Sequence, residues 1–238
     1  MQQLLLDVFT PPKPTLVNFL VGDNAQVINA LDALAQHHQG AQAGSPDFPV
    51  IYLYGSPGCG KSHLLRAIAN QLDTRVLPGN SRFVFRPEQG CLIIDDVAQL
   101  TPYSQVQVFN AFNSHVAGTA PGIIVLADAL PPQALPVRED LKTRILAGLC
   151  LRVQPLSDHE KTAALNQMAT ERGLQLSEEV LDYALKNFRR DMGSLIAVLD
   201  GLDRFSLEQQ KPVSLYLLRH WMRRRESLLV KHHKSHTP

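Results

Sequence analysis

The sequence predicts an α/β fold in which helices sandwich a parallel sheet, followed by a smaller domain made only of helices. Between residues 50 and 127, apolar strand-like runs alternate with helix-like runs, which is typical of parallel strands joined by crossover helices. After Pro155 only helical patterns follow. Ligands bind such sheets at the carboxyl ends of the strands, so we expect the site at that edge.

Hydrophobic spacing and capping residues place the elements of the sheet domain. A first helix after Gly22 has apolar residues at core spacing, with Asp23 or Asn24 as its cap. The next elements are expected at 50–54 (strand), 61–72 (helix), 82–85 (weak strand), 91–95 (strand), 103–117 (helix) and 122–127 (strand).

The helical domain is indicated by two capping signals. Ser157 precedes a predicted helix over 158–172, and Ser177, with Glu179 behind it, precedes one over 178–188. Two further helices are expected over 190–205 and 213–225. The predicted domains are a peptide and Pro-rich spacer at 1–14, the sheet domain at 15–154, the helical domain at 155–226 and a disordered basic tail at 227–238.

A complete G-x-x-x-x-G-K-[ST] phosphate loop lies between the first strand and its helix. Its glycines allow a tight turn that aims backbone N–H groups inward, and the start of the helix adds a positive dipole. Lys61 is expected at the β- and γ-phosphates, and Ser62 at a magnesium ion. The predicted nucleotide contacts of this loop are Gly55, Ser56, Pro57, Gly58, Cys59, Gly60, Lys61, Ser62 and His63.

An apolar run that ends in two carboxylates supplies the second half of a phosphate-loop site. Asp95 is the predicted Mg²⁺ ligand. Asp96 lies where a carboxylate can orient or deprotonate an attacking water. The pair therefore has the composition of a hydrolytic site. The alternative is a solvated turn at the end of a strand.

Composition limits the other function classes. The chain has 238 residues, 45% apolar and 19% charged, which suits one larger and one smaller domain. A net charge of +1 argues against a uniformly basic nucleic-acid binder. Three widely spaced cysteines suggest neither a disulfide framework nor a zinc site. With no signal peptide and no apolar run long enough for a membrane span, a cytoplasmic protein is expected.

The order of these motifs resembles the AAA+ nucleotide switches, and most of all the DnaA family. Residues 19–24 are similar to the family's first box, which implies that Gly22 and Asp23 lie near the adenine. Residues 123–128 resemble the sensor-one strand and imply that Asp128 lies on the γ-phosphate side, although Ala127 replaces the family's hydroxyl. Residues 187–192 resemble the sensor-two segment and imply Arg190, or its neighbour Arg189, as a phosphate contact.

The segment from Glu139 to Arg144 resembles the Leu-Lys-Ser-Arg sequence whose last residue is the family's arginine finger. The resemblance implies that Arg144 acts in trans, reaching the nucleotide of a neighbouring subunit and neutralising charge on its transferring phosphoryl group. A surface helix of mixed charge is the alternative interpretation.

The chain leaves no room after Trp221 for the DNA-binding domain that ends DnaA, so the resemblance implies the shorter, Hda-type regulators of replication initiation. These stimulate hydrolysis of the ATP bound to DnaA while tethered to the DNA polymerase sliding clamp, and so meet DNA through the clamp. The implied ligands are ADP or ATP with Mg²⁺, with weak intrinsic ATPase activity if any. Residues 3–9 resemble a clamp-binding peptide, with contacts from Gln3, Leu4, Leu6 and Phe9.

Two other functions stay open at this stage. The intact Lys61, Asp95 and Asp96 allow an autonomous loader ATPase, and the helical domain with the basic tail allows a nucleotide-gated adaptor. The sequence also leaves open whether ADP or ATP is the working ligand, and whether the chain forms a homo-oligomer.

Overall fold

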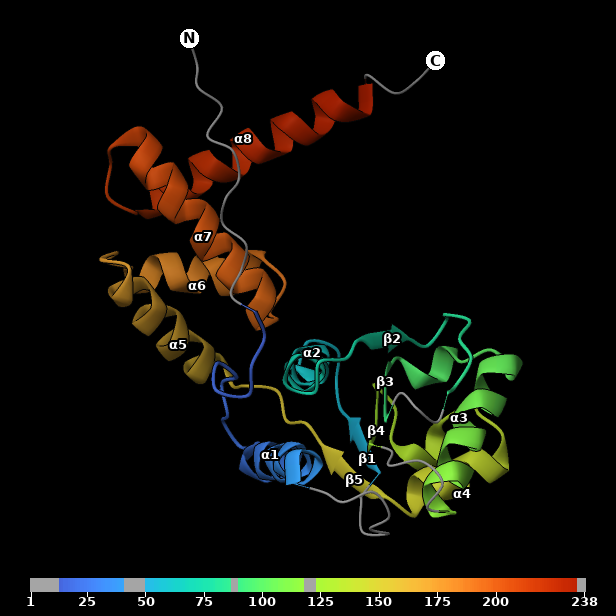
Figure 1. Ribbon diagram of the computed structural model, residues 1–238. Coiled ribbons are helices and arrows are strands. Elements are labelled where there is room, and N and C mark those ends of the chain that lie inside the picture. The colour runs from blue at the N-terminus through green and yellow to red at the C-terminus, as the bar shows by residue number, and fades with distance from the viewer. Residues whose placement is uncertain (1–12, 41–49, 87–89, 118–122, 235–238) are drawn as a thin grey trace. The chain divides into compact units, whose positions relative to one another are not determined.

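The computed structural model describes residues 13–40, 50–86, 90–117 and 123–234 (Figure 1). The chain forms two compact units, residues 1–155 and residues 156–238. In the described ranges no helix is both long and apolar enough to cross a bilayer.

The first unit is built on a five-stranded sheet with strand order β2-β3-β4-β1-β5, and every neighbouring pair is parallel. Parallel neighbours require crossover connections, which the intervening helices supply. The strands are rich in Ile, Val and Leu, as expected for a sheet buried on both faces. They are β1 (Ile51–Tyr54), β2 (Val76–Pro78), β3 (Cys91–Asp95), β4 (Ile123–Asp128) and β5 (Leu149–Arg152).

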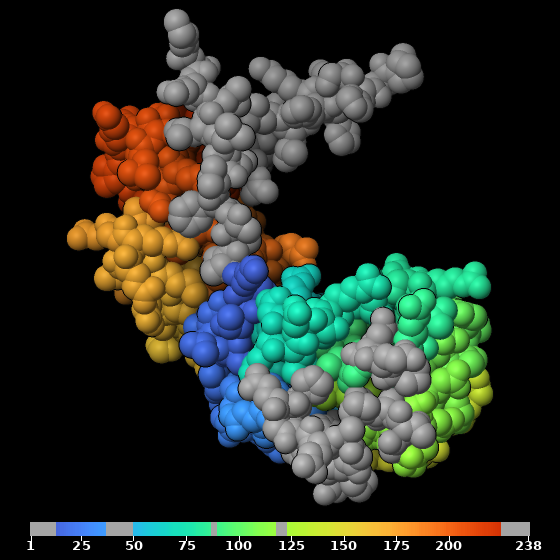
Figure 2. Space-filling model, viewed as in Figure 1, coloured from blue at the N-terminus to red at the C-terminus, as the bar shows by residue number. Residues whose placement is uncertain are grey.

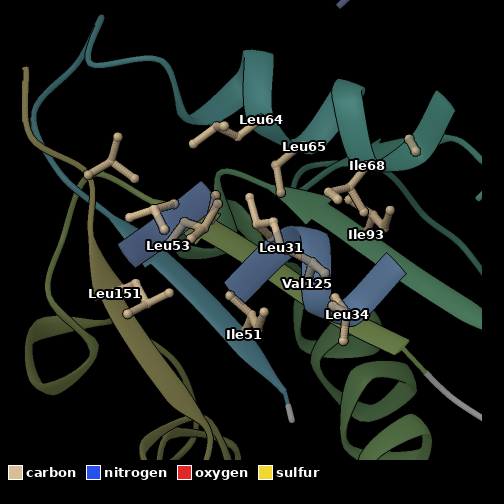
Figure 3. Packing of buried hydrophobic residues seen from close by; sticks show 14 of the residues in the cluster. Leu31, Leu34, Ile51, Leu53, Leu64, Leu65, Ile68, Ile93, Val125 and Leu151 are labelled. Atoms are coloured by element: carbon tan, nitrogen blue, oxygen red, sulfur yellow. The ribbon is translucent and has the colours of Figure 1, made fainter. Parts of the chain in front are cut away.

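Helices cover the sheet on both faces, so the predicted three-layer α/β architecture is confirmed. Alternate strand residues point to opposite faces. Ile51 and Leu53 pack against α1 (Ala25–Gly40) and α2 (Lys61–Gln71), as Figure 3 shows. Val50 and Tyr52 belong to the core of the other face, under α3 (Pro102–Val116) and α4 (Glu139–Leu146). The sheet is thereby fixed between two apolar layers, and only its edges are left for chemistry.

The predicted strand at 82–85 is not formed, and the second strand is β2 instead. The alternating Phe83 and Phe85 do turn toward the core, where they pack against the cluster beneath α3. The backbone of Phe85, however, donates its N–H to the Oε1 of Gln107 on α3 at 3.1 Å, and takes no place in the sheet. Alternation here reflects packing against a helix, which sequence spacing does not distinguish from strand pairing.

In its described residues the second unit has four helices with two apolar clusters between them. Ser157 caps α5 as predicted and also forms a capping box with Glu160, whereas Ser177 occupies the cap position without accepting a side-chain bond. The last helix extends past residue 226, where the helical domain is predicted to end, because no Gly or Pro interrupts it. The helices are α5 (Asp158–Glu171), α6 (Glu178–Asn187), α7 (Met192–Gln209) and α8 (Leu215–Lys234).

A glycine within α7 allows α8 to pack closely against it. A Cβ built on Gly201 would overlap the indole of Trp221, whose ring also lies 6.2 Å from that of Phe188, centroid to centroid. The absence of a side chain at Gly201 therefore lets the indole lie against the α7 backbone.

We expect Gly201→Ala to lower the free energy of unfolding of this unit by about 1–3 kcal/mol, because the methyl group overfills a packed contact. Trp221 is the sole tryptophan of the chain, so urea unfolding followed by its emission reports on this unit. Gly193→Ala on the same helix is the control, since its Cβ would meet only an Asp191 oxygen at 3.5 Å. Equal unfolding midpoints for the two variants would contradict the packing argument.

Candidate nucleotide-binding site

The phosphate loop lies at the carboxyl end of β1, where the chain turns from Tyr54 into α2. Gly58 and Gly60 have positive φ angles of 81° and 107°, which glycine adopts without strain. Gly60 is the N-cap of α2 and provides no side-chain cap. The first N–H groups of the helix are thus free of a side-chain acceptor at the cap, as an anion site requires.

Two glycines of the loop also allow close contacts with distant segments. A Cβ on Gly55 would overlap the carbonyl oxygen of Val153, which follows β5. A Cβ on Gly60 would lie 2.6 Å from the ring of Phe19. The loop is therefore held against segments far away in the sequence, and Phe19 is a contributor that motif spacing alone does not identify.

Lys61 braces the loop from inside. Its side chain is 8% exposed, and the ammonium donates to the carbonyls of Gly55 at 2.7 Å and Ser56 at 3.1 Å. The Sγ of Cys59 lies 3.7 Å from the same nitrogen. A buried ammonium needs such acceptors, and it places a positive charge directly beneath the turn.

The acidic pair lies at the end of the neighbouring strand β3. Asp95 is the last strand residue, and Asp96 adopts a left-handed backbone with φ 56° and an exposed side chain. Gly79, after β2, donates its N–H to the Asp95 carbonyl at 2.7 Å, and a Cβ there would overlap the Asp96 carbonyl. The turn that aims Asp96 outward is therefore braced by the neighbouring strand.

Several charged side chains act on Asp96 at this turn. Burial raises the pKa of Asp96, the charges of Asp95 and Asp128 raise it further, and Lys61 opposes them. No cluster of three metal-ligating side chains occurs among the described residues. One carboxylate and one hydroxyl, Asp95 and Ser62, nevertheless fit Mg²⁺, which usually takes its remaining ligands from water and phosphates.

Asp128 holds the acidic turn in place. Its side chain is 4% exposed, its Oδ2 accepts the N–H of Ala98 at 2.6 Å, and its Oδ1 accepts the N–H of Leu130 at 3.0 Å. Ala98 lies in the short 3₁₀ helix η2 (Val97–Gln99) that follows Asp96. Both carboxylate oxygens thus serve backbone donors, and a contact with the γ-phosphate stays a prediction.

The first-box residues form a tight turn before α1. Gly22 has φ 45°, and the exposed Asp23 precedes Asn24, whose N–H donates to the Val21 carbonyl at 2.8 Å. The Asn24 side chain also exchanges two hydrogen bonds with the backbone of Gln154, at 2.7 and 2.9 Å. Asn24 therefore ties this turn to the end of β5, a role beyond the predicted cap.

The side chain of His63 turns away from the loop. Its Nε2 lies 3.1 Å from the Thr15 carbonyl, and its ring tilts against Phe19 with centroids 5.7 Å apart. The contact of His63 with a nucleotide stays a prediction.

Arg144 lies near the amino ends of the strands, whereas the phosphate loop lies at their carboxyl ends. It occupies the last turn of α4, and the chain then enters β5 where Leu149 donates its N–H to the carbonyl of Val50, just before β1. The four residues of β1 separate this edge from the loop by about 13 Å. The half-buried Arg144 donates to the Oδ1 of Asn113 at 3.3 Å, and among the described residues it has no carboxylate partner.

The other two arginines predicted to contact phosphate belong to the second unit. Arg190 is exposed in the second unit, where it pairs with Asp158 at 3.4 Å, and Arg189 pairs with Asp191 at 3.2 Å. Their contact with phosphates stays a prediction. The predicted clamp-binding residues Gln3, Leu4, Leu6 and Phe9 lie outside the described residues.

Both units match known families. Residues 51–129 match the ATPase family associated with various cellular activities (AAA), and residues 158–222 match the family described as the lid domain of Hda. The AAA match covers the phosphate loop, the acidic pair and Asp128, and it supports binding of an adenine nucleotide at this edge.

Solved structures show the same fold. DnaA of Aquifex aeolicus bound to AMPPCP is 24% identical, over 84% of this chain and 70% of that chain, with a TM-score of 0.60. Domain III of Thermotoga maritima DnaA is 23% identical, over 90% of this chain and 98% of that chain, with a TM-score of 0.65. A RuvB variant from the same organism is 17% identical, over 88% of this chain and 71% of that chain, with a TM-score of 0.66.

We expect Asp128→Ala to lower the free energy of unfolding of the first unit by about 1–3 kcal/mol for each backbone N–H that loses its acceptor. Asp128→Asn keeps one acceptor and should lose less. Far-UV circular dichroism during urea unfolding measures the change. The control is Asp32→Ala, because that carboxylate accepts only from the exposed Gln36 side chain; a loss no larger than the control's would exclude the bracing role.

Proposed function

We propose, from the premise that this chain is a DnaA-related AAA+ protein with a lid domain of the Hda family, that it regulates replication initiation. In this proposal the chain binds an adenine nucleotide at its phosphate loop. Tethered to the DNA polymerase sliding clamp, it stimulates hydrolysis of the ATP bound to DnaA. DnaA is thereby returned to its ADP form.

The placement of Arg144 is the observation that carries the proposal. Arg144 lies a strand length away from the chain's own phosphate loop, which supports a role toward the nucleotide of a neighbouring protein. Its single bond to the neutral Asn113 side chain leaves its charge uncompensated within the described structure. Arginine stays charged under all physiological conditions and its planar donors match phosphate oxygens.

The chemical role of Arg144 follows from the reaction. As the γ-phosphoryl group of ATP leaves for water, negative charge spreads over its oxygens, and a guanidinium supplied in trans stabilises that charge. The chain's own loop has a different task in the proposal: with Lys61 and the N–H groups of α2 it binds a nucleotide that sets the state of the regulator. Mg²⁺ held through Ser62 and Asp95 would offset the charge of that nucleotide's phosphates.

We expect Arg144→Ala to lower the stimulated rate of DnaA-bound ATP hydrolysis by a factor of about 10³, the usual effect of an arginine finger. A reconstituted assay with DnaA, DNA-loaded clamp and this protein measures the rate. Arg138→Ala is the matched control, because Arg138 lies at the other end of α4 and pairs with Asp140 at 2.6 Å. If Arg144→Ala stimulated hydrolysis as strongly as this control, the finger assignment would be wrong.

We expect deletion of residues 1–9 to abolish retention by the clamp without changing ADP affinity, since the clamp-like motif lies wholly within these residues. Co-elution with purified clamp and an ADP titration of the same sample measure the two properties. Retention equal to that of the full chain would place the clamp contact elsewhere.

A further inference from the structure

The residues that follow the predicted clamp peptide form a self-braced turn, residues Lys13–Phe19, which we call the N-terminal strap. The Thr15 N–H donates to the Oδ1 of Asn18 at 2.9 Å, and the Asn18 N–H donates to the Oγ1 of Thr15 at 3.1 Å. The Asn18 amide also donates to the Lys13 carbonyl at 3.0 Å. These local bonds give the strap a defined shape of its own, as reciprocal side-chain to backbone bonds do in turns.

The strap lies along α2. Asn70 donates its Nδ2 to the Pro14 carbonyl at 2.9 Å, and the His63 Nε2 lies 3.1 Å from the Thr15 carbonyl. Residues 63 and 70 are two turns apart on the same face of the helix, so the strap is held at two points along it. Figure 2 shows this blue N-terminal segment against the turquoise helix. Leu16 also packs against the core beneath.

The end of the strap touches the phosphate loop itself. The ring of Phe19 lies so close to Gly60 that a Cβ there would be 2.6 Å from it, and the ring also contacts His63. Gly60 is the N-cap of α2, where phosphate would meet the helix N–H groups. A change in the loop at Gly60 therefore acts directly on Phe19.

We propose that nucleotide binding at the phosphate loop and docking of the N-terminal strap on α2 stabilise each other. The bound nucleotide then holds the strap in place along α2, from Lys13 to Phe19. The strap leads through Leu20 and Val21 to the turn at Gly22, so docking of the strap also positions the entry to that turn. This inference rests on the proposed nucleotide binding, and it does not depend on the clamp or on Arg144.

The coupling must be reciprocal. If nucleotide favours the docked strap by some factor, weakening the docked strap lowers nucleotide affinity by up to the same factor. A strap that merely covered the apolar side of α2 would be docked equally with and without nucleotide. The two cases are therefore separable by measurement.

Hydrogen exchange of the full chain tests the proposal directly. The amides of Thr15, Asn18 and Phe19 are all donors within the strap, so their exchange reports the stability of its turn, which firmer docking on α2 increases. With saturating ADP and Mg²⁺ we expect them to exchange about two- to tenfold more slowly, the range of one additional stabilising hydrogen bond. Unchanged or faster exchange, in a sample whose calorimetric titration shows ADP binding, would overturn the coupling. No binding heat and no protection of the loop would overturn the proposed function instead.

A variant at the far end of the strap gives the reciprocal measurement. Asn70→Ala removes the bond to Pro14 two turns away from the phosphate loop, and we expect the ADP Kd to rise about two- to tenfold. Gln71→Ala is the matched control, since this adjacent amide on α2 is exposed and bonds nothing in the strap. An unaltered far-UV circular dichroism spectrum and urea unfolding midpoint verify the fold of both variants. An ADP Kd equal to that of Gln71→Ala would contradict the proposal.

Discussion

The parallel register of β1, β3 and β4 is the constraint on which the site depends. Tyr54 is paired with Asp128, and Ile94 with Leu126, so three strands end together at one edge. The phosphate loop, the acidic turn and the Asp128 carboxylate are then neighbours in space, although they lie far apart in the sequence. Apolar layers on both faces hold this register, because slipping one strand by a residue would move its core side chains to the wrong face.

The turns at this edge are held by groups that are remote in the sequence. The Val153 carbonyl and the Phe19 ring take the space beside Gly55 and Gly60, and Gly79 takes the space beside Asp96. Each of these contacts requires glycine because a backbone or a ring approaches too closely for a methyl group. The phosphate loop is thus packed against segments that are distant in the sequence, and the N-terminal strap is one of these segments. This is the physical basis for expecting a nucleotide to influence the strap.

In the proposed regulator, the phosphate loop and the arginine finger are separated by the length of a strand. Its own loop faces the carboxyl edge, and Arg144 lies where α4 enters β5 at the amino edge. In the proposal, this separation lets the protein bind its own nucleotide while Arg144 completes the site of a neighbour. The buried Lys61 acts at the carboxyl edge, where its charge lowers the pKa of Asp96 and so opposes the neighbouring carboxylates.

The sequence by itself determined the layered α/β fold, the helical lid, the phosphate loop and the acidic pair, because periodic apolar spacing and glycine-rich turns express local physics. It also identified Ser157 as a helix cap, because a serine directly before a helical pattern is a local signal. Tertiary structure alone decided that the Phe83 and Phe85 alternation packs on α3, that Asp128 braces the acidic turn, and that His63 bonds the strap. Each of these outcomes joins segments distant in the chain, and spacing along a sequence carries no information about which distant partner fills a given space.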